Sequence, residues 1–262
     1  MHPMSMQNER KLKTLFKLWP IHTALPVAWL KEKGFSRSLI QKYLFSGWLH
    51  SLDRGVVVRP DDKVEWSGLL WGLQQLHPFH IGGKTALELQ GKAHFVKFQE
   101  TKIFLFTKPG FKLPKWLKEE RGSIEFVNVP TNLFAREVSL KEHSFGEYAL
   151  KISNPARAFL EYIHLSEKYH SLDEAYYLME GLQFLSHDLM QEALEECRSV
   201  KVKRLVLCLA KKQNANWLKE IGRSKINLGT GVREAVKHGK YDPEFLITYP
   251  QSWDRHENEA LF

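Results

Sequence analysis

The sequence predicts a protein of mixed α/β (α+β) class that folds in two domains. Its 262 residues are more than one domain of ordinary size requires. Apolar residues recur at helical spacing near the N-terminus and again after residue 153, whereas the apolar runs at 101–107 and 123–129 are typical of strands. We therefore expect a smaller domain at 1–62 and a larger mixed α/β domain at 63–262.

Composition places the chain among ordinary globular proteins. Hydrophobic residues make up 43% and charged residues 26%, which argues against disorder or a fibrous repeat. No apolar run approaches the roughly 18 residues that cross a bilayer, and the first residues lack the apolar segment of a secretory signal. We expect a cytoplasmic protein without a membrane partner. Cys197 and Cys208 lack zinc-site and disulfide spacing, so both are expected to be small buried residues.

The positive charge is concentrated near the N-terminus. The whole chain carries a formal net charge of +8. Residues 1–60 alone contain ten Lys and Arg against three Asp and Glu, and 10 − 3 gives +7. A basic module on a nearly neutral remainder indicates a polyanionic partner, because phosphate contacts release counterions. The alternative is a basic face that serves only solubility.

Two helices are predicted at the start of the chain. Residues 11–19 form the first, because their apolar side chains have i, i+3, i+4, i+7 spacing and Pro20 stops the pattern. Residues 25–33 form the second, with Pro26 in its first turn and Gly34 at its end. The side chains expected to face the core are Leu12, Leu15, Phe16 and Trp19 in the first helix and Leu25, Ala28, Trp29 and Leu30 in the second.

A third helix follows the glycine corner. Ser36 is a typical N-cap, and the helical pattern continues to about Ser46. Two short helices joined by a glycine turn, the second basic on its outer side, form the arrangement that lays a recognition helix in the major groove of DNA. The buried side is expected to contain Ile40, Tyr43 and Leu44, and the outer side Arg37, Ser38, Gln41 and Lys42.

A β-hairpin is predicted directly after the third helix. Alternating apolar positions flank the turn Asp53-Arg54-Gly55, which precedes three valines at 56–58. A hairpin in this place is a wing, and Arg54 at its tip would reach the DNA backbone or the minor groove. We therefore expect residues 1–62 to form a winged helix-turn-helix. A plain three-helix packing module, or a winged helix that binds protein, remains the alternative.

The outer side of the third helix supplies the candidate base contacts. Arg37 can bond O6 and N7 of guanine, Gln41 can bond N6 and N7 of adenine, and Ser38 can bond either base. Lys42 is better suited to a phosphate. The expected DNA-binding residues are Ser36, Arg37, Ser38, Gln41, Lys42 and Arg54.

The rest of the chain alternates helices and strands before it becomes mainly helical. An amphipathic helix at 64–76 either covers the winged module or leads away from it, so the domain boundary stays open between 60 and 95. A second boundary near 150 would separate the α/β part from the helical part. The further elements expected are a short helix at 85–89, strands at 101–107 and 123–129, helices that start at Asn154 and Ser171, helices at 187–197 and 200–211, and a terminal β-hairpin.

No catalytic or metal-binding motif is apparent in the larger domain. Gly82-Gly83-Lys84-Thr85 lacks the first glycine of a phosphate-binding loop. His77 and His80 lack further ligands at metal-site spacing. We expect no catalytic residues, no metal and no cofactor. The residues that would form a second basic surface are Arg223, Lys225, Arg233, Lys237 and Lys240, although surface lysines are often only solvated.

Six segments of the chain together resemble one known family. The segments are GFSRSLIQKYLFSGWLHSLDRGVVVRP, GGKTALELQGKAHFV, LPKWL, NPARAFLEYI, VKVKRLVLCLA and INLGTGVREAVKHGKYDPEFLITYP. In this order they are similar to the AbiEi antitoxins of type IV toxin–antitoxin systems, over about residues 11–250. The second strand of the wing reads VVVRP and lacks a tyrosine expected there, a departure from the family that concerns the contacts of the wing and not its existence.

The resemblance implies two separable activities. The winged helix would bind inverted repeats in double-stranded promoter DNA and repress its own operon, with two copies acting cooperatively on DNA and a monomer expected in solution. The C-terminal domain would counteract a nucleotidyltransferase toxin of the AbiEii type without a stable complex, and such systems abort phage infection. The family supplies no catalytic residues for this domain.

Two other functions fit the same sequence. The first is a nuclease or nucleotide-processing enzyme that the winged helix targets to DNA. The second is an adaptor whose C-terminal domain grips a partner protein. The absence of a catalytic motif is only weak evidence against an enzyme, because active sites are assembled from residues far apart in the chain.

Overall fold

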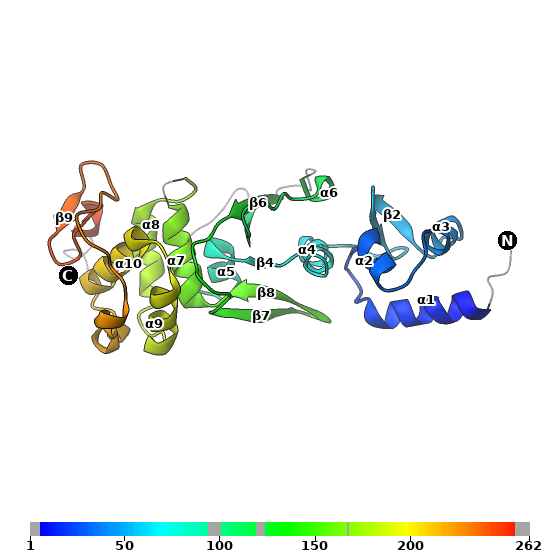
Figure 1. The fold of residues 1–262 in the computed structure, drawn as a ribbon, viewed down its shortest axis with the longest axis horizontal. Coiled ribbons are helices and arrows are strands. Elements are labelled where there is room, and N and C mark those ends of the chain that lie inside the picture. The colour runs from blue at the N-terminus through cyan, green and yellow to red at the C-terminus, as the bar shows by residue number, and fades with distance from the viewer. Residues whose placement is uncertain (1–5, 94–100, 119–123, 167, 255–262) are drawn as a thin grey trace. The chain divides into compact units, whose positions relative to one another are not determined.

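A computed structural model describes residues 6–93, 101–118, 124–166 and 168–254. The chain divides into two units (Figure 1). The N-terminal unit consists of residues 1–79, 111–126 and 142–151, and the C-terminal unit of 80–110, 127–141 and 152–262. Helices and strands occur in both, which confirms the mixed α/β class.

The N-terminal unit begins with a winged helix-turn-helix, as predicted. Its helices are α1 (Met6–Leu18), α2 (Val27–Glu32) and α3 (Arg37–Phe45), and its strands are β1 (Leu25–Pro26), β2 (His50–Asp53) and β3 (Val56–Val58). The strands pair in the order β1-β3-β2, so that β2 and β3 form the wing. Apolar side chains that include Leu15, Trp19, Leu30, Ile40 and Tyr43 form one core cluster between these elements.

The second helix is shorter than predicted. We expected a helix over 25–33, but residues 25–26 form β1, which pairs with β3, and α2 begins only at Val27. Ala28, expected in the core, is exposed. The local apolar spacing does not reveal this strand, because its hydrogen-bonding partner lies in the distant wing and tertiary pairing overrides local propensity.

Helix α4 (Trp66–Gln74) packs against the backbone of the winged module. A Cβ atom on Gly68 would lie 1.9 Å from the carbonyl oxygen of His22, and one on Gly72 would lie 1.9 Å from that of Ala24. Only glycine permits so close an approach of helix and chain. The helix predicted at 64–76 therefore covers the winged module, which was one of the two alternatives.

A five-stranded sheet follows, in the order β6-β5-β4-β8-β7. Its strands are β4 (Phe79–Ile81), β5 (Thr101–Thr107), β6 (Ile124–Pro130), β7 (Leu140–Phe145) and β8 (Tyr148–Ser153), and short helices α5 (Gly83–Leu89) and α6 (Lys115–Lys118) lie between them in sequence. The predicted strands correspond to β5 and β6. Strands β4, β7 and β8 were not predicted. Strand β4 is very short, and every described side chain of β7 is at least partly exposed, so its residues do not alternate between apolar and polar.

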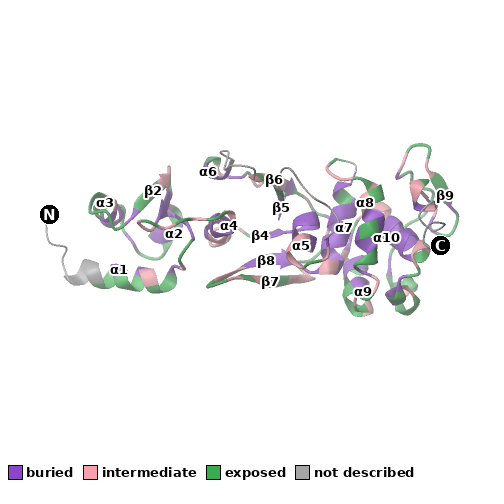
Figure 2. Cartoon of the chain, turned by 180° about the vertical axis from the view of Figure 1, so that it is seen from behind, coloured by how far each residue is buried: buried purple, intermediate pink, exposed green. Residues whose placement is uncertain are grey.

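The remaining residues of the C-terminal unit form a helical layer and a terminal hairpin. The elements are α7 (Pro155–Leu165), α8 (Leu172–Glu180), α9 (His187–Glu196), α10 (Val200–Lys212), the 3₁₀ helices η1 (Asn216–Glu220) and η2 (Arg223–Lys225), and strands β9 (Lys240–Asp242) and β10 (Ile247–Tyr249). Figure 2 shows that α7 and α10 are largely buried. Among the described residues, no helix is both long and apolar enough to cross a bilayer.

Local capping signals explain where these helices begin. The side chain of Asn154 accepts a hydrogen bond from the backbone N–H of Arg157, which starts α7 ahead of a proline in its first turn. Ser171 caps α8 in the same way. Both predicted helix starts are confirmed.

Cys197 and Cys208 are buried and free, and burial raises the pKa of their thiols to about 11 and about 12, which leaves them protonated at neutral pH.

Candidate nucleic-acid interface

The corner between α2 and α3 fixes the direction of α3. Gly34 has a φ of +84°, a conformation that favours glycine, and Phe35 donates its N–H back to the carbonyl of Leu30 at 3.0 Å. Ser36 then caps α3, because its Oγ accepts a hydrogen bond from the N–H of Leu39 at 3.2 Å. The predicted N-cap is therefore confirmed, and the buried side of α3 consists of Leu39, Ile40 and Tyr43.

The opposite side of α3 is exposed and carries free polar groups. Arg37, Ser38, Gln41 and Lys42 are all exposed. The Ser38 hydroxyl lies 3.0 Å from that of Ser36, so these two serines bond each other. Within the described part of the chain, no hydrogen bond or ion pair engages the side chains of Arg37, Gln41 or Lys42. These three groups can therefore meet an external ligand without first breaking a contact.

The wing presents one further free cation. Strands β2 and β3 pair antiparallel with a register shift between Ser51 and Asp53. Gly55 supplies the positive φ of +87° that the turn requires, and the Asp53 carboxylate accepts a hydrogen bond from the N–H of Arg54. The Arg54 side chain is exposed, and no acidic side chain among the described residues pairs with it.

Arg59, another basic residue of the N-terminal segment, has structural contacts within the winged module. Arg59 donates from Nη2 to the carbonyl of Phe16 at 2.8 Å, and its guanidinium lies 4.8 Å from the Phe16 ring centroid and 5.6 Å from that of Trp19. It thereby fastens the end of the wing to α1.

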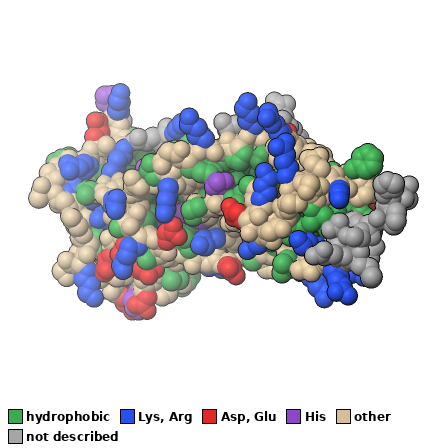
Figure 3. All heavy atoms as spheres, turned by 45° about the vertical axis from the view of Figure 1, so that its right-hand side comes forward, with side chains coloured by type: hydrophobic (Ala, Val, Ile, Leu, Met, Phe, Trp, Pro, Cys, Tyr) green, Lys and Arg blue, Asp and Glu red, His purple; other side chains and the backbone are tan. Residues whose placement is uncertain are grey.

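Figure 3, in which the right-hand side of Figure 1 is turned forward, shows Lys and Arg side chains (blue) at the right with few acidic ones (red) among them.

The second basic surface is partly neutralised by carboxylates. Arg223 pairs with Glu244, and Lys240 pairs with Asp254. Bonds from Lys211 and Arg223 hold the pKa of Glu244 below its ordinary value. The exposed side chains of Lys225, Arg233 and Lys237 have no acidic partner among the described residues. Three of the five predicted charges thus have no carboxylate partner among the described residues, and of these three Arg233 donates from Nη1 to the carbonyl of Val232 at 3.1 Å.

A buried arginine shapes the loop that carries this surface. Arg204, on α10, donates from Nε to the carbonyl of Leu228 at 2.9 Å and from Nη2 to that of Gly229 at 3.2 Å. Its Nη1 contacts the carbonyls of Gly231 at 2.6 Å and Leu246 at 3.0 Å. One guanidinium therefore binds three carbonyls of the glycine-rich loop and joins them to the carbonyl of Leu246. Arg204 was not predicted as a buried residue, because α10 also carries Lys201, Lys203, Lys211 and Lys212 and the sequence does not distinguish a basic side chain that turns inward from the others.

A second buried cluster centres on Glu161 of α7. Its Oε1 accepts hydrogen bonds from His80 Nε2 and Arg157 Nε, both at 2.8 Å. Its Oε2 accepts from the N–H of Gly83 at 3.0 Å and from Ser153 Oγ at 2.7 Å. Burial alone would raise the pKa of Glu161, but His80, Arg157 and Ser153 lower it to about 2. His80 is thus hydrogen-bonded to a carboxylate. The four donors saturate both oxygens of Glu161, which is typical of a structural cluster.

A third polar group surrounds His170, beside a cavity. Glu174 accepts hydrogen bonds from Lys84 Nζ at 2.6 Å and from the Tyr162 hydroxyl at 2.7 Å, and the His170 ring stacks on Tyr162 with centroids 4.5 Å apart. Burial, aided by Lys84, lowers the pKa of His170 to about 4.

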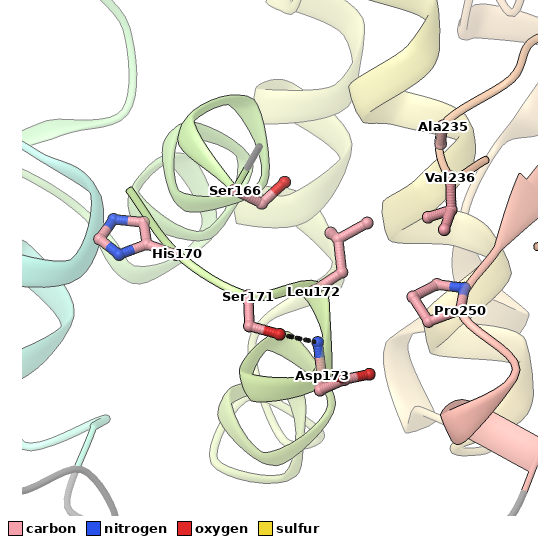
Figure 4. A pocket seen from close by; sticks show the side chains of 8 residues that line it. All are labelled: Ser166, His170, Ser171, Leu172, Asp173, Ala235, Val236 and Pro250. Carbon is pink, nitrogen blue, oxygen red and sulfur yellow. Dashed lines mark hydrogen bonds between the residues drawn. The ribbon is translucent and has the colours of Figure 1, made fainter. Parts of the chain in front are cut away.

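The adjoining cavity offers little chemistry. It has a volume of about 310 Å³ and is lined by Ser166, His170, Ser171, Leu172, Asp173, Ala235, Val236 and Pro250. Figure 4 shows the His170 ring turned away from Ala235, Val236 and Pro250. The Ser171 hydroxyl is engaged by the N–H of Asp173 at 3.0 Å. No three His, Cys, Asp or Glu side chains of the described residues lie together as a metal site would need.

Comparison with known proteins supports one family across nearly the whole chain. The family model "Transcriptional regulator, AbiEi antitoxin N-terminal domain" matches residues 8–98, and "Transcriptional regulator, AbiEi antitoxin, Type IV TA system" matches residues 100–250. No curated protein sequence matches the chain. The crystal structure of the RV2827C protein from Mycobacterium tuberculosis matches with a TM-score of 0.56 and 14% identity, over 94% of this chain and 92% of that one. At that identity the match shows a shared fold alone.

Proposed function

The chain belongs to the family of AbiEi antitoxins and transcriptional regulators of type IV toxin–antitoxin systems, and we propose that α3 and the wing bind inverted repeats in the promoter of its own operon. Bound there, the protein represses transcription. Base and phosphate contacts come from Ser36, Arg37, Ser38, Gln41, Lys42 and Arg54 within the domain proposed at 1–62. Helix α4 supports that domain from outside its boundary.

The unpaired outer side of α3 is the observation that carries this proposal. Its nine residues, at a rise of about 1.5 Å each, give a rod of roughly 13 Å, which matches a major groove about 12 Å wide. Because Arg37, Gln41 and Lys42 have no partner among the described residues, no internal bond is lost when they meet DNA. The free-energy cost of removing water from these polar groups is then offset by their hydrogen bonds to bases and phosphates.

The test is a footprint on the DNA upstream of the gene, followed by titration of single substitutions. Arg37→Ala and Gln41→Ala should relax base preference at one position each and cost about 1–3 kcal/mol there. Lys42→Ala and Arg54→Ala should weaken all duplexes alike and reduce the slope of log affinity against log salt by about 1. Lys141→Ala, an exposed lysine on β7, removes the same charge elsewhere and serves as control. Equal affinity of the wild type for operator and scrambled duplexes would refute the proposal.

For the larger domain, proposed at 63–262, we propose that it counteracts a nucleotidyltransferase toxin without forming a stable complex. The support is the family, whose description names a transcriptional regulator and antitoxin of a type IV system. Co-expression with the toxin should restore growth, whereas tagged antitoxin should not retain the toxin on a column. Stable co-purification would favour the adaptor function instead.

The remaining free charges of the second basic surface are proposed to contact nucleic acid as well. Combined replacement of Lys225, Arg233 and Lys237 by alanine should impair growth rescue while promoter binding by the winged helix persists. Loss of promoter binding alone would assign this surface to the operator.

We further propose a cytoplasmic protein that is a monomer in solution and binds the paired repeats cooperatively. Sedimentation analysis with and without operator DNA measures the number of copies in each state.

A further inference from the structure

Phe45 is an aromatic side chain with no place in the core. It ends α3 and is 97% exposed, and Trp48 just beyond it is 46% exposed. Burial of a phenylalanine side chain stabilises a fold, so a fully solvated one at an ordered position contributes none of that stabilisation in the free protein. Exposed apolar side chains that cluster on an otherwise polar face mark a contact surface.

Helix geometry places Phe45 in the middle of the face that carries the free polar groups. At about 100° per residue, Ser38, Gln41 and Phe45 fall within an arc of roughly 60°. Arg37 flanks this arc on one side and Lys42 on the other, about 140° apart on the same scale. All five side chains are exposed, in agreement with this geometry. Viewed down the axis, the direction of Phe45 lies between those of Arg37 and Lys42, which have no partner among the described residues. Along the axis Phe45 ends the helix, about 4.5 Å from Lys42 and about 12 Å from Arg37.

The charge around Phe45 selects the kind of partner. A hydrophobic protein surface that covered this side of α3 would have to bury Lys42 next to the ring and Arg37 at the other end of the helix, neither of which has an acidic partner among the described residues, and burial of unpaired charge is costly. A DNA duplex supplies phosphates for both cations. In the major groove it also offers one apolar group at base level, the 5-methyl group of thymine, which side chains such as phenylalanine contact.

We infer that Phe45 reads thymine methyl groups in the operator and is a further specificity-determining residue of α3. This inference rests on the proposed function. The Cα atoms of Gln41 and Phe45 differ by about 6 Å along the helix, close to two base-pair steps of about 3.4 Å. The thymine should accordingly lie about two base pairs from the base that Gln41 contacts in each repeat.

The test uses operator duplexes in which single thymines are replaced by deoxyuridine. This change removes only the methyl group and keeps base pairing. A buried methyl-sized group is worth about 0.8 kcal/mol, so one such replacement should weaken wild-type binding about 4-fold at that half-site, and replacements in both half-sites about 15-fold in all. Phe45→Ala should bind the natural operator more weakly and lose the difference between thymine and uracil at that position, and Phe45→Leu should keep part of it. Phe184→Ala, at a site 85% exposed in the C-terminal unit, should behave as the wild type.

Each outcome decides one question. If the wild type and Phe45→Ala respond equally to uracil at every position, the inference is wrong, although operator binding stands. If Phe45→Ala changes the sedimentation coefficient of the free protein but not the uracil response, the ring contacts a second copy of the chain, and the inference is again overturned. If the wild type shows no operator preference, the proposed function itself fails. Since Phe45 is outside the core, the variant should retain the wild-type unfolding temperature, which thermal circular dichroism checks.

Discussion

Replacement of Glu161 by glutamine tests whether the buried cluster is an ionic one. The carboxylate has both oxygens occupied, one by His80 and Arg157 and the other by Gly83 and Ser153. Removal of one partner from a buried ion pair typically costs about 3–5 kcal/mol, because the other charge stays buried without compensation. We expect a loss of about that size in the free energy of unfolding.

The geometry explains why glutamine cannot substitute. Its amide has one oxygen and one NH₂ group, and the NH₂ group must face either Arg157 Nε–H or the backbone N–H of Gly83. Neither of these groups can accept a hydrogen bond. His80 can exchange tautomers and Ser153 can rotate its hydroxyl, so they can adapt. One buried donor is nevertheless left facing another in either orientation of the amide.

Urea unfolding at pH 7 measures the effect, with the fluorescence of the buried Trp217 and Trp253 as probe. Glu234→Gln, which changes an exposed carboxylate, should leave the midpoint unchanged. The wild type should also lose stability as pH falls from about 4.5 toward 2, because the folded-state pKa of Glu161 is lowered to about 2. The variant should lack that loss. A cost below about 1 kcal/mol at unchanged urea dependence would refute the ionic interpretation.

Four further outcomes follow from the described contacts. Ser36→Ala should cost about 1 kcal/mol in thermal unfolding through the lost cap of α3. Gly72→Ala should cost about 2–3 kcal/mol in urea unfolding, because its Cβ would overlap the Ala24 carbonyl. Arg204→Lys should cost about 2–4 kcal/mol and speed hydrogen exchange in the glycine-rich loop, because an ammonium group cannot span the four carbonyls. Between pH 7 and pH 5 the wild type should lose about 2 kcal/mol of unfolding free energy relative to His170→Gln, as measured by urea unfolding. Burial and Lys84 lower the folded-state pKa of His170 to about 4, so the proton taken up in this range binds the unfolded chain and favours it.

Controls are available for these outcomes. Gly222→Ala, whose Cβ would have its nearest neighbour at 3.6 Å, should be neutral beside Gly72→Ala. A loop that exchanges at the wild-type rate in Arg204→Lys would show that the carbonyls are held by other means. Parallel pH profiles for the wild type and His170→Gln would contradict the lowered pKa.

Elements with local signals were predictable from the sequence, and those with distant partners were not. Ser36 predicts the start of α3, because an N-cap bonds a backbone N–H within three residues of itself. Gly55 predicts the turn of the wing, because the turn requires a positive φ at that residue. The cluster of Glu161 was missed, since its partner His80 is remote in the chain and only the fold brings the two together. Arg204 was missed on the same ground.

The candidate interface was predictable in its polar residues and not in Phe45. Charge and hydrogen-bonding capacity single out Arg37 and Gln41 in the sequence itself. An aromatic residue in an amphipathic pattern is ordinarily a core residue, so its exposure had to come from the structure. The partial neutralisation of the second basic surface was equally invisible, because Glu244 and Asp254 reach Arg223 and Lys240 through space.

The glycine contacts of α4 have a mechanical consequence for the wing. At Gly68 and Gly72 the helix touches the carbonyls of residues 22 and 24 directly, so no side chain can change rotamer there and absorb a displacement. The same stretch of chain runs on into β1, which is paired with β3 of the wing. We therefore expect a tilt of α4 to move β1 and the base of the wing with it, together with the arm that carries Arg54.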